Sequence, residues 1–168
     1  MEQAARTGLT LLGLAALVVL GGLVGWSALT QPFPEKSTPP KCVATILQPG
    51  EKVFPGQVTV SVFNASGRNG LASATMAEFS DAGFAEGDTG NVPSRAKVVR
   101  AAIWAPTATS PDVRLVASRL GPATPVVRRD GPGVGVTVVV GDAYSKLVKG
   151  PPSVRVTKEA EICSPPVT

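Results

Sequence analysis

An uncharged, apolar stretch from Gly8 to Leu29 limits the architecture of this chain more than any other feature. An α-helix rises about 1.5 Å per residue, so about 20 apolar residues cross the hydrocarbon core of a bilayer. A cleaved signal peptide has a shorter apolar centre followed by small residues, and Gly25 and Ser27 offer only a poor cleavage site around Trp26. The stretch predicts an uncleaved transmembrane helix at 8–29 after a cytoplasmic N-terminus at 1–7, with a cleaved signal as the alternative.

The two cysteines indicate on which side of the membrane the rest of the chain lies. Basic residues flank the apolar stretch almost equally, so charge alone does not orient it. Cys42 and Cys163 bracket nearly everything that follows, as expected of a disulfide in an oxidising compartment. We therefore expect a single-pass protein of the cell (plasma) membrane with an extracytoplasmic C-terminal domain. The alternative is two unpaired thiols.

Composition excludes several classes of chemistry. The 168 residues include no histidine, so imidazole catalysis and histidine-ligated metal sites are absent. Two cysteines so far apart make neither a C-x-x-C redox motif nor a zinc site, and we expect no metal and no cofactor. The net charge of +4 is spread along the chain without a basic block, which argues against a nucleic-acid partner. Solubility explains this charge, and attraction to anionic envelope polymers is the alternative.

The remaining sequence predicts one small domain. A proline-rich linker at 30–41 leads to a domain at 42–164, with its core at 57–143 and a tail at 165–168. The order of patterns along the core is β-α-β-β-α-β-β, which predicts an α/β (α+β) domain with two helices packed on one face of a mixed sheet. The predicted strands are Gln57–Phe63, Phe84–Asp88, Lys97–Trp104, Thr124–Arg128 and Gly135–Val140, and the helices begin at Leu71 and Pro111 and end before Gly83 and Gly121. We expect 149–168 to lie against the domain only through Cys163.

Two motifs resemble a known family. The chain reads VSVFNASG at 60–67, continues with Gly70-Leu71-Ala72, and ends its most apolar strand with Gly141-Asp142. The pattern is similar to the C-terminal domain of LytR-type cell-wall proteins, and a single span before one such domain is similar to small actinobacterial envelope-integrity proteins. The resemblance covers about 57–143 and implies a role in maintaining the envelope. The separate catalytic domain of the larger LytR-type ligases is missing, so their activity is not carried over.

The loop between the first strand and the first helix is the candidate ligand site. Backbone N–H groups at a helix N-terminus suit a phosphate, glycan or muropeptide, although the loop is neither G-x-G-x-x-G nor a Walker loop. A structural role is the alternative, in which Asn64 and Ser66 hydrogen-bond the loop backbone, Gly67 has a positive φ and Asn69 caps the helix. Trp104, at a strand end, is a candidate sugar-stacking platform, with simple packing as the alternative. The candidate residues are Asn64, Ser66, Gly67, Asn69, Gly70 and Trp104.

The sequence therefore favours a non-catalytic, membrane-anchored protein that contributes to envelope integrity. Its predicted partners are the membrane, through 8–29, and peptidoglycan, another wall polymer or an envelope-assembly protein. One rival hypothesis is an accessory or catalytic subunit acting on lipid-linked wall precursors, with Arg95, Arg100 and Arg128 converging on a pocket. The other is a sensor of a small ligand or lipid, with an apolar cavity between helices and sheet.

Overall fold

The structure, a computed structural model, describes residues 13–26, 41–93 and 96–166. The chain divides into two units, Met1–Thr38 and Pro39–Thr168, which are described separately. In the first unit, 13–26 is helical. No helix within the described ranges is both long enough and apolar enough to cross a membrane. The flanks of the predicted span at 8–12 and 27–29, the predicted N-terminus at 1–7 and the linker at 30–40 lie outside these ranges.

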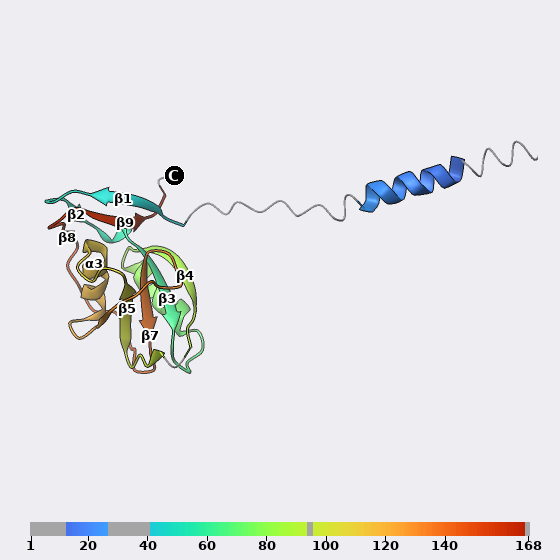
Figure 1. Cartoon of the computed structure of the whole chain (residues 1–168). Helices are drawn as coiled ribbons and strands as arrows, with labels where there is room; N and C mark the ends of the chain where they lie inside the picture. The colour runs from blue at the N-terminus through green and yellow to red at the C-terminus, as the bar shows by residue number, and fades with distance from the viewer. Residues whose placement is uncertain (1–12, 27–40, 94–95, 167–168) are drawn as a thin grey trace, which may run out of the picture. The chain divides into compact units, whose positions relative to one another are not determined.

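A five-stranded mixed sheet forms the centre of the second unit (Figure 1). The strand order is β4-β3-β7-β5-β6. Strand β3 is parallel to both of its neighbours, β5 is antiparallel to β7, and β6 is parallel to β5. The strands are β3 (Thr59–Asn64), β4 (Ala85–Asn91), β5 (Ala101–Ala105), β6 (Val126–Arg128) and β7 (Val136–Val140).

Helices α2 (Leu71–Asp81) and α3 (Pro111–Leu120) pack with one face of this sheet into the main core. Side chains alternate between the faces of a strand, so Val60 and Val62 of β3 reach this core while Phe63 reaches the other face. Phe79 is fully buried and its ring meets that of Phe84 edge to face, with centroids 5.4 Å apart. The predicted order of strands and helices and the mixed sheet are confirmed.

A second, smaller cluster lies on the opposite face of the sheet. It contains Phe63, Ala65, Trp104 and Val139. A glycine-rich loop at 131–135 also packs closely against this sheet. A Cβ atom on Gly131 would overlap the Thr137 side chain, and one on Gly133 would overlap Ser61. Both threonine and serine are fully buried, so the loop can lie this close only because it carries glycine.

Four short strands outside the predicted core enlarge the domain. Strands β1 (Val43–Leu47) and β9 (Ala160–Ser164) pair as an antiparallel ribbon, and β2 (Lys52–Val53) pairs with β8 (Val154–Arg155). A single 3₁₀ turn, η1 (Pro55–Gln57), follows β2. Leu47 and Ile162 enter the main core. The expectation that 149–168 lies against the domain only through Cys163 is therefore wrong, because β8 and β9 bind it by backbone hydrogen bonds and apolar packing.

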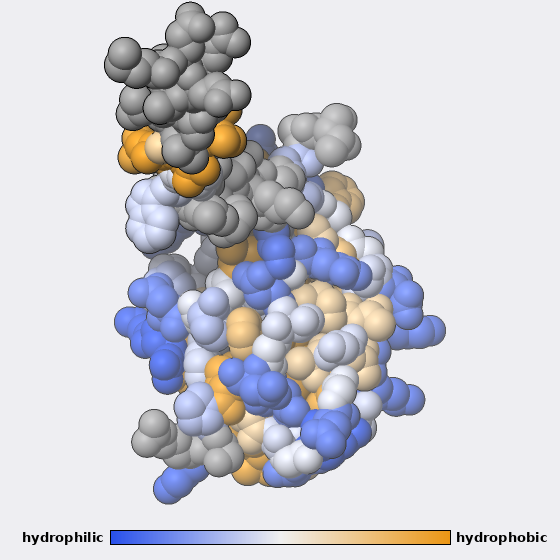
Figure 2. Space-filling view, turned by 90° about the vertical axis from the view of Figure 1, so that its right-hand side faces the viewer, coloured by the Kyte–Doolittle hydropathy of each residue, from blue (hydrophilic) through white to orange (hydrophobic). Residues whose placement is uncertain are grey.

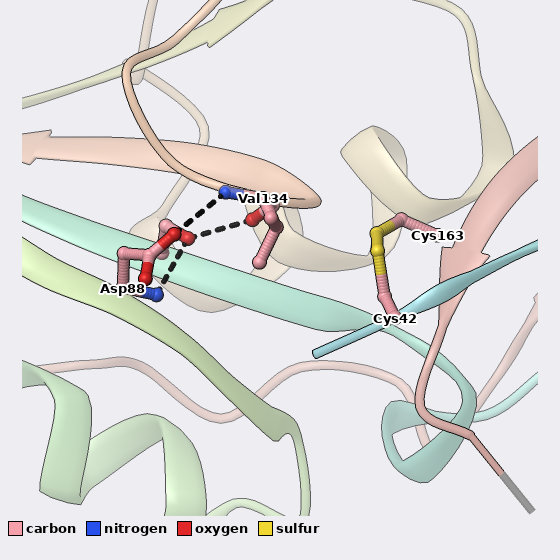
Figure 3. Close-up of a disulfide and its surroundings, with 5 residues drawn as sticks. Cys42, Asp88, Val134 and Cys163 are labelled. Carbon is pink, nitrogen blue, oxygen red and sulfur yellow. Dashed lines mark hydrogen bonds between the residues drawn. A yellow bond between two sulfur atoms is a disulfide. The ribbon is translucent and has the colours of Figure 1, made fainter. Parts of the chain in front are cut away.

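Two interactions hold the start of this domain in place: a disulfide, drawn in Figure 3 near Asp88 and Val134, and an ion pair between Lys41 and Asp88. Cys42 and Cys163 form a disulfide with their Cα atoms 5.4 Å apart, which confirms the predicted pairing. Lys41 Nζ donates to Asp88 Oδ1 at 2.6 Å, and the other carboxylate oxygen accepts from the Val134 N–H at 3.1 Å. These bonds connect the segment before β1 to β4 and to the glycine-rich loop. The hydrogen bonds and the charge of Lys41 lower the pKa of Asp88 below its usual value of 3.8.

Replacing Asp88 with asparagine should lower the free energy of unfolding by about 1 kcal/mol at pH 7, because both groups of the ion pair are partly exposed and screened by solvent. A carboxyl with a lowered folded-state pKa stabilises the fold above 3.8 and stops doing so as pH falls through its folded value. Urea unfolding across pH 2–7 should therefore show the two proteins converging at acid pH. A constant difference at every pH would contradict this account. Glu86→Gln, exposed on the same strand, is the control.

Candidate functional site

The direction of β5 gives the sheet two distinct ends. Strands β3, β4 and β7 run one way and β5 and β6 the other, so loops that follow β3 and β5 leave from opposite ends. Asn64 pairs with Val140 at the end of β7, whereas Trp104 pairs with Thr137 near its start. The structure therefore separates the predicted loop from Trp104. They do not form one site.

A cleft of about 810 Å³ opens at the carboxyl end of β5. The start of α3, the glycine-rich loop, the segment before β9 and the β1–β9 ribbon with its disulfide surround it, so it draws on segments far apart in the sequence. Its size lies within the range of small-molecule and peptide pockets. Its polar and charged lining side chains are Thr107, Thr109, Ser110, Asp112, Arg114, Asp130, Thr157, Lys158, Glu159 and Glu161; Trp104 and both cysteines also line it.

Asp112 is the buried charged group of this cleft, at 9% exposure. As the second residue of α3, it accepts hydrogen bonds at Oδ1 from the Ser110 hydroxyl and from the Val113 N–H. Ser110 is the N-cap residue of α3, but its hydroxyl bonds to Asp112 instead of a helix N–H. Burial raises the pKa of Asp112, and the two hydrogen bonds oppose that rise. The carboxylate thus occupies the positive end of the helix dipole.

The Asn64–Gly70 loop satisfies its polar groups internally. Asn64, 6% exposed, donates from Nδ2 to the carbonyl of Arg68 at 2.7 Å. Its Oδ1 accepts from the N–H of Ser66 at 2.8 Å and from the hydroxyl of that serine at 2.7 Å. The Gly67 N–H donates to Asp142 Oδ1 at 3.1 Å. The side chains of Asn64 and Ser66 therefore build the loop, and the nearest hollow, lined by Gly67 and Asp142, measures only about 350 Å³.

Two predictions about this loop are wrong. The residue with a positive φ is Gly70, at 73°, and not Gly67. Gly70 is also the N-cap of α2, with no side-chain capping bond, so Asn69 does not cap the helix. Gly70, in the left-handed conformation, makes the turn into α2 and stands at the N-cap position that the prediction gave to Asn69. A ligand at Asn64, Ser66, Gly67, Asn69 or Gly70 stays a prediction.

Trp104 lines the cleft, but the residue is buried, at 7% exposure. The Arg129 guanidinium carbon lies 4.0 Å from the ring centroid, a cation–π stack that covers one face of the indole. Packing within the domain therefore covers most of the indole surface. The predicted role as a sugar-stacking platform stays a prediction, limited to the edge that reaches the cleft.

The two described arginines that the enzyme-subunit hypothesis required, Arg100 and Arg128, do not converge on one pocket. Arg100 precedes β5 and donates to the Leu120 carbonyl at the end of α3. Arg128 pairs with Ala105 at the other end of β5. Arg95 lies outside the described residues. Neither described arginine lines the cleft, whose basic side chains are Arg114 and Lys158.

The family model that matches this chain describes an envelope-related domain. The model of the family described as LytR cell envelope-related transcriptional attenuator matches residues 57–144, and the chain belongs to this family. A similar solved structure is the soluble domain of a conserved hypothetical secreted protein, an Rv2700 ortholog, from Mycobacterium marinum. It is 25% identical, with 62% of this chain and 70% of that chain covered and a TM-score of 0.48. No curated protein matches this sequence. The predicted family is confirmed.

Proposed function

We propose that this chain is a non-catalytic, membrane-anchored envelope protein whose extracytoplasmic domain, at 42–164, supports envelope integrity by binding a cell-wall polymer or an envelope-assembly protein. The observation that carries the proposal is the open cleft of about 810 Å³ on a domain of the LytR-C family. Its mixed lining of carboxylates, hydroxyls and short apolar side chains suits an extended polar ligand.

The chemistry of the cleft supports binding over catalysis. Ser110 donates to Asp112, but a carboxyl group is far too weak a base to ionise an alcohol appreciably, and the chain holds no histidine to replace it. The same hydroxyl and carboxylate sit at the start of α3, where they order the helix end. The rival catalytic subunit requires converging cations, which Arg100 and Arg128 do not supply.

Anchorage and location rest on the first unit and on the disulfide. The helical residues 13–26 are apolar on every side, and their leucine and valine residues are 59–74% exposed. They lie within the longer uncharged stretch at 8–29. Such a helix is stable where lipid covers it. The Cys42–Cys163 disulfide favours an oxidising location outside the cytoplasm.

The sensor hypothesis stays as a second alternative with less support. The space between helices and sheet is filled by the main core, including fully buried Leu115, Val116 and Leu120. The face in Figure 2 is largely covered by hydrophilic side chains, with apolar areas among them. The large apolar side chains exposed on the domain are Val43, Ile46, Phe54, Val99, Val127 and Val148.

A retention assay tests the proposal. The full-length chain, held in detergent micelles, is mixed with isolated peptidoglycan and, separately, with immobilised envelope-assembly proteins; cellulose is the inert control. We expect specific retention that Ala44→Trp abolishes, because Ala44 is an exposed residue of β1 on the cleft. Ala143→Trp is the matched control, at an exposed position in the smaller hollow. Retention on neither target, or equal retention on cellulose, would contradict the proposal.

A further inference from the structure

The charge of the cleft is opposite to that of the whole chain. Four carboxylates line it against two basic side chains, although the chain carries a net charge of +4. Asp130, Glu159 and Glu161 are exposed and Asp112 is buried at the helix end. Among the described residues, none of the four forms an ion pair; the pair that is present joins Lys41 to Asp88. The three exposed carboxylates are therefore open to a cation from outside.

An anion is the competing ligand, because the N-terminus of α3, Arg114 and Lys158 would attract one. The chain already fills that helix end with its own carboxylate, since Asp112 accepts the Val113 N–H. Arg114 directs one guanidinium nitrogen to the Arg155 carbonyl, at 3.4 Å. Arg114 keeps its charge, so two cations, Arg114 and Lys158, oppose three exposed carboxylates and the buried Asp112. A positively charged ligand is favoured.

A metal ion does not fit this distribution. Within the described part of the chain, no three acidic or cysteine side chains come close enough together to ligate one ion. The carboxylates come from three different segments that line the cleft: Asp112 from α3, Asp130 beside the glycine-rich loop, and Glu159 and Glu161 beside and within β9. Separated carboxylates along an open cleft match an extended ligand that carries ammonium groups.

The exposed carboxylates differ in their hydrogen bonds to the rest of the protein. Glu159 accepts a hydrogen bond from the Gln48 side chain, whereas within the described residues the Asp130 and Glu161 carboxylates accept none.

We infer that the cleft binds a peptide bearing free primary ammonium groups, with Asp130 and Glu161 as its principal counter-charges. The inference rests on the proposed function and makes it more specific. Peptidoglycan is a wall polymer with stem peptides, whose uncrosslinked amines supply such groups. The ligand is therefore the amine-bearing peptide of the wall, and the glycan strand contributes little charge to recognition.

The test compares soluble muropeptides before and after acetylation of their amines, using the full-length chain in detergent micelles and calorimetry. Acetylation removes the positive charge and leaves the rest of the peptide in place. Exposed charge pairs contribute about two- to fivefold each, so losing two of them should weaken binding about 4- to 25-fold. We expect acetylation to have this effect on the wild type, and Asp130→Asn with Glu161→Gln to have a similar effect on binding of the unmodified peptide. Raising the salt concentration should weaken wild-type binding. Glu86→Gln, outside the cleft, should change nothing.

The outcomes separate this inference from the function on which it rests. Equal binding of free and acetylated muropeptides overturns the inference, and so does binding at the wild-type level by the double variant. If the chain is nevertheless retained on peptidoglycan, the proposed function still stands. Loss of retention on every envelope target ends both. Binding of a lysine peptide of the same length, with no binding of muropeptides, overturns the wall-peptide assignment. Because Asp130 and Glu161 are exposed, the double variant should keep the wild-type melting temperature, which a thermal scan checks.

Discussion

Replacing Cys42 and Cys163 together with serine should lower the free energy of unfolding by about 4–5 kcal/mol. The disulfide joins residues 121 positions apart, and cross-linking so long a loop removes much of the conformational entropy of the unfolded chain. A loss of this size approaches the whole stability of many domains. Urea unfolding of the full-length chain in micelles measures it, and wild-type protein in reducing agent should match the variant.

The ribbon should open before the sheet does. Without the disulfide, β1 and β9 depend on their mutual backbone bonds, on the packing of Leu47 and Ile162, and on exposed polar contacts such as the ion pair between Lys41 and Asp88. Hydrogen exchange should therefore accelerate most at the amides of the ribbon and least in β3 and β7, which lie inside the sheet. Since the ribbon also forms one wall of the cleft, peptidoglycan retention should fall with it. A stability loss below about 1 kcal/mol would show that packing alone holds the ends of the domain together.

Local patterns predicted the sheet and helices because each central element shows its own period. The alternation from Val60 to Phe63 matches β3, and the apolar spacing after Pro111 matches α3. Four outer strands were not predicted, and two of them, β2 and β8, are only two residues long and show no period. One signal could have revealed the ribbon: pairing Cys42 with Cys163 brings the segments beside them together. The register is a separate matter, since Cys163 lies opposite Ala44 in the ribbon and not opposite Cys42.

The cleft could not be predicted from local patterns because it is built by segments that only the fold brings together. Nothing in the sequence links Ala44, Ser110, Asp130 and Glu161. Asp112 looked like an ordinary acidic residue in the first turn of a helix, where most are solvated. Its burial follows from the ribbon and loop that pack around the start of α3. The predicted loop, in contrast, was visible because its polar residues are consecutive, which is also why they can bond to one another.

Replacing Gly135 with alanine should lower the free energy of unfolding by about 3 kcal/mol. Gly135 has a φ of 68°, a left-handed conformation that costs an alanine about 1–3 kcal/mol. Its Cβ would also overlap the carbonyl oxygen of Thr59, which is main chain and cannot move without disturbing β3. Overpacking of this kind adds about 1–3 kcal/mol. Urea unfolding of the full-length variant in micelles measures the sum.

Gly67→Ala is the matched control for this prediction. Gly67 has no positive φ, and no atom lies within 4 Å of where its Cβ would be. Replacing it with alanine should therefore change the free energy of unfolding by less than about 1 kcal/mol. The change should be an increase if alanine reduces the conformational entropy of the unfolded chain. Gly135 also lines the cleft, so Gly135→Ala should weaken peptidoglycan retention and Gly67→Ala should not. Equal effects of the two substitutions on retention would indicate that the glycine-rich loop has no part in forming the binding surface.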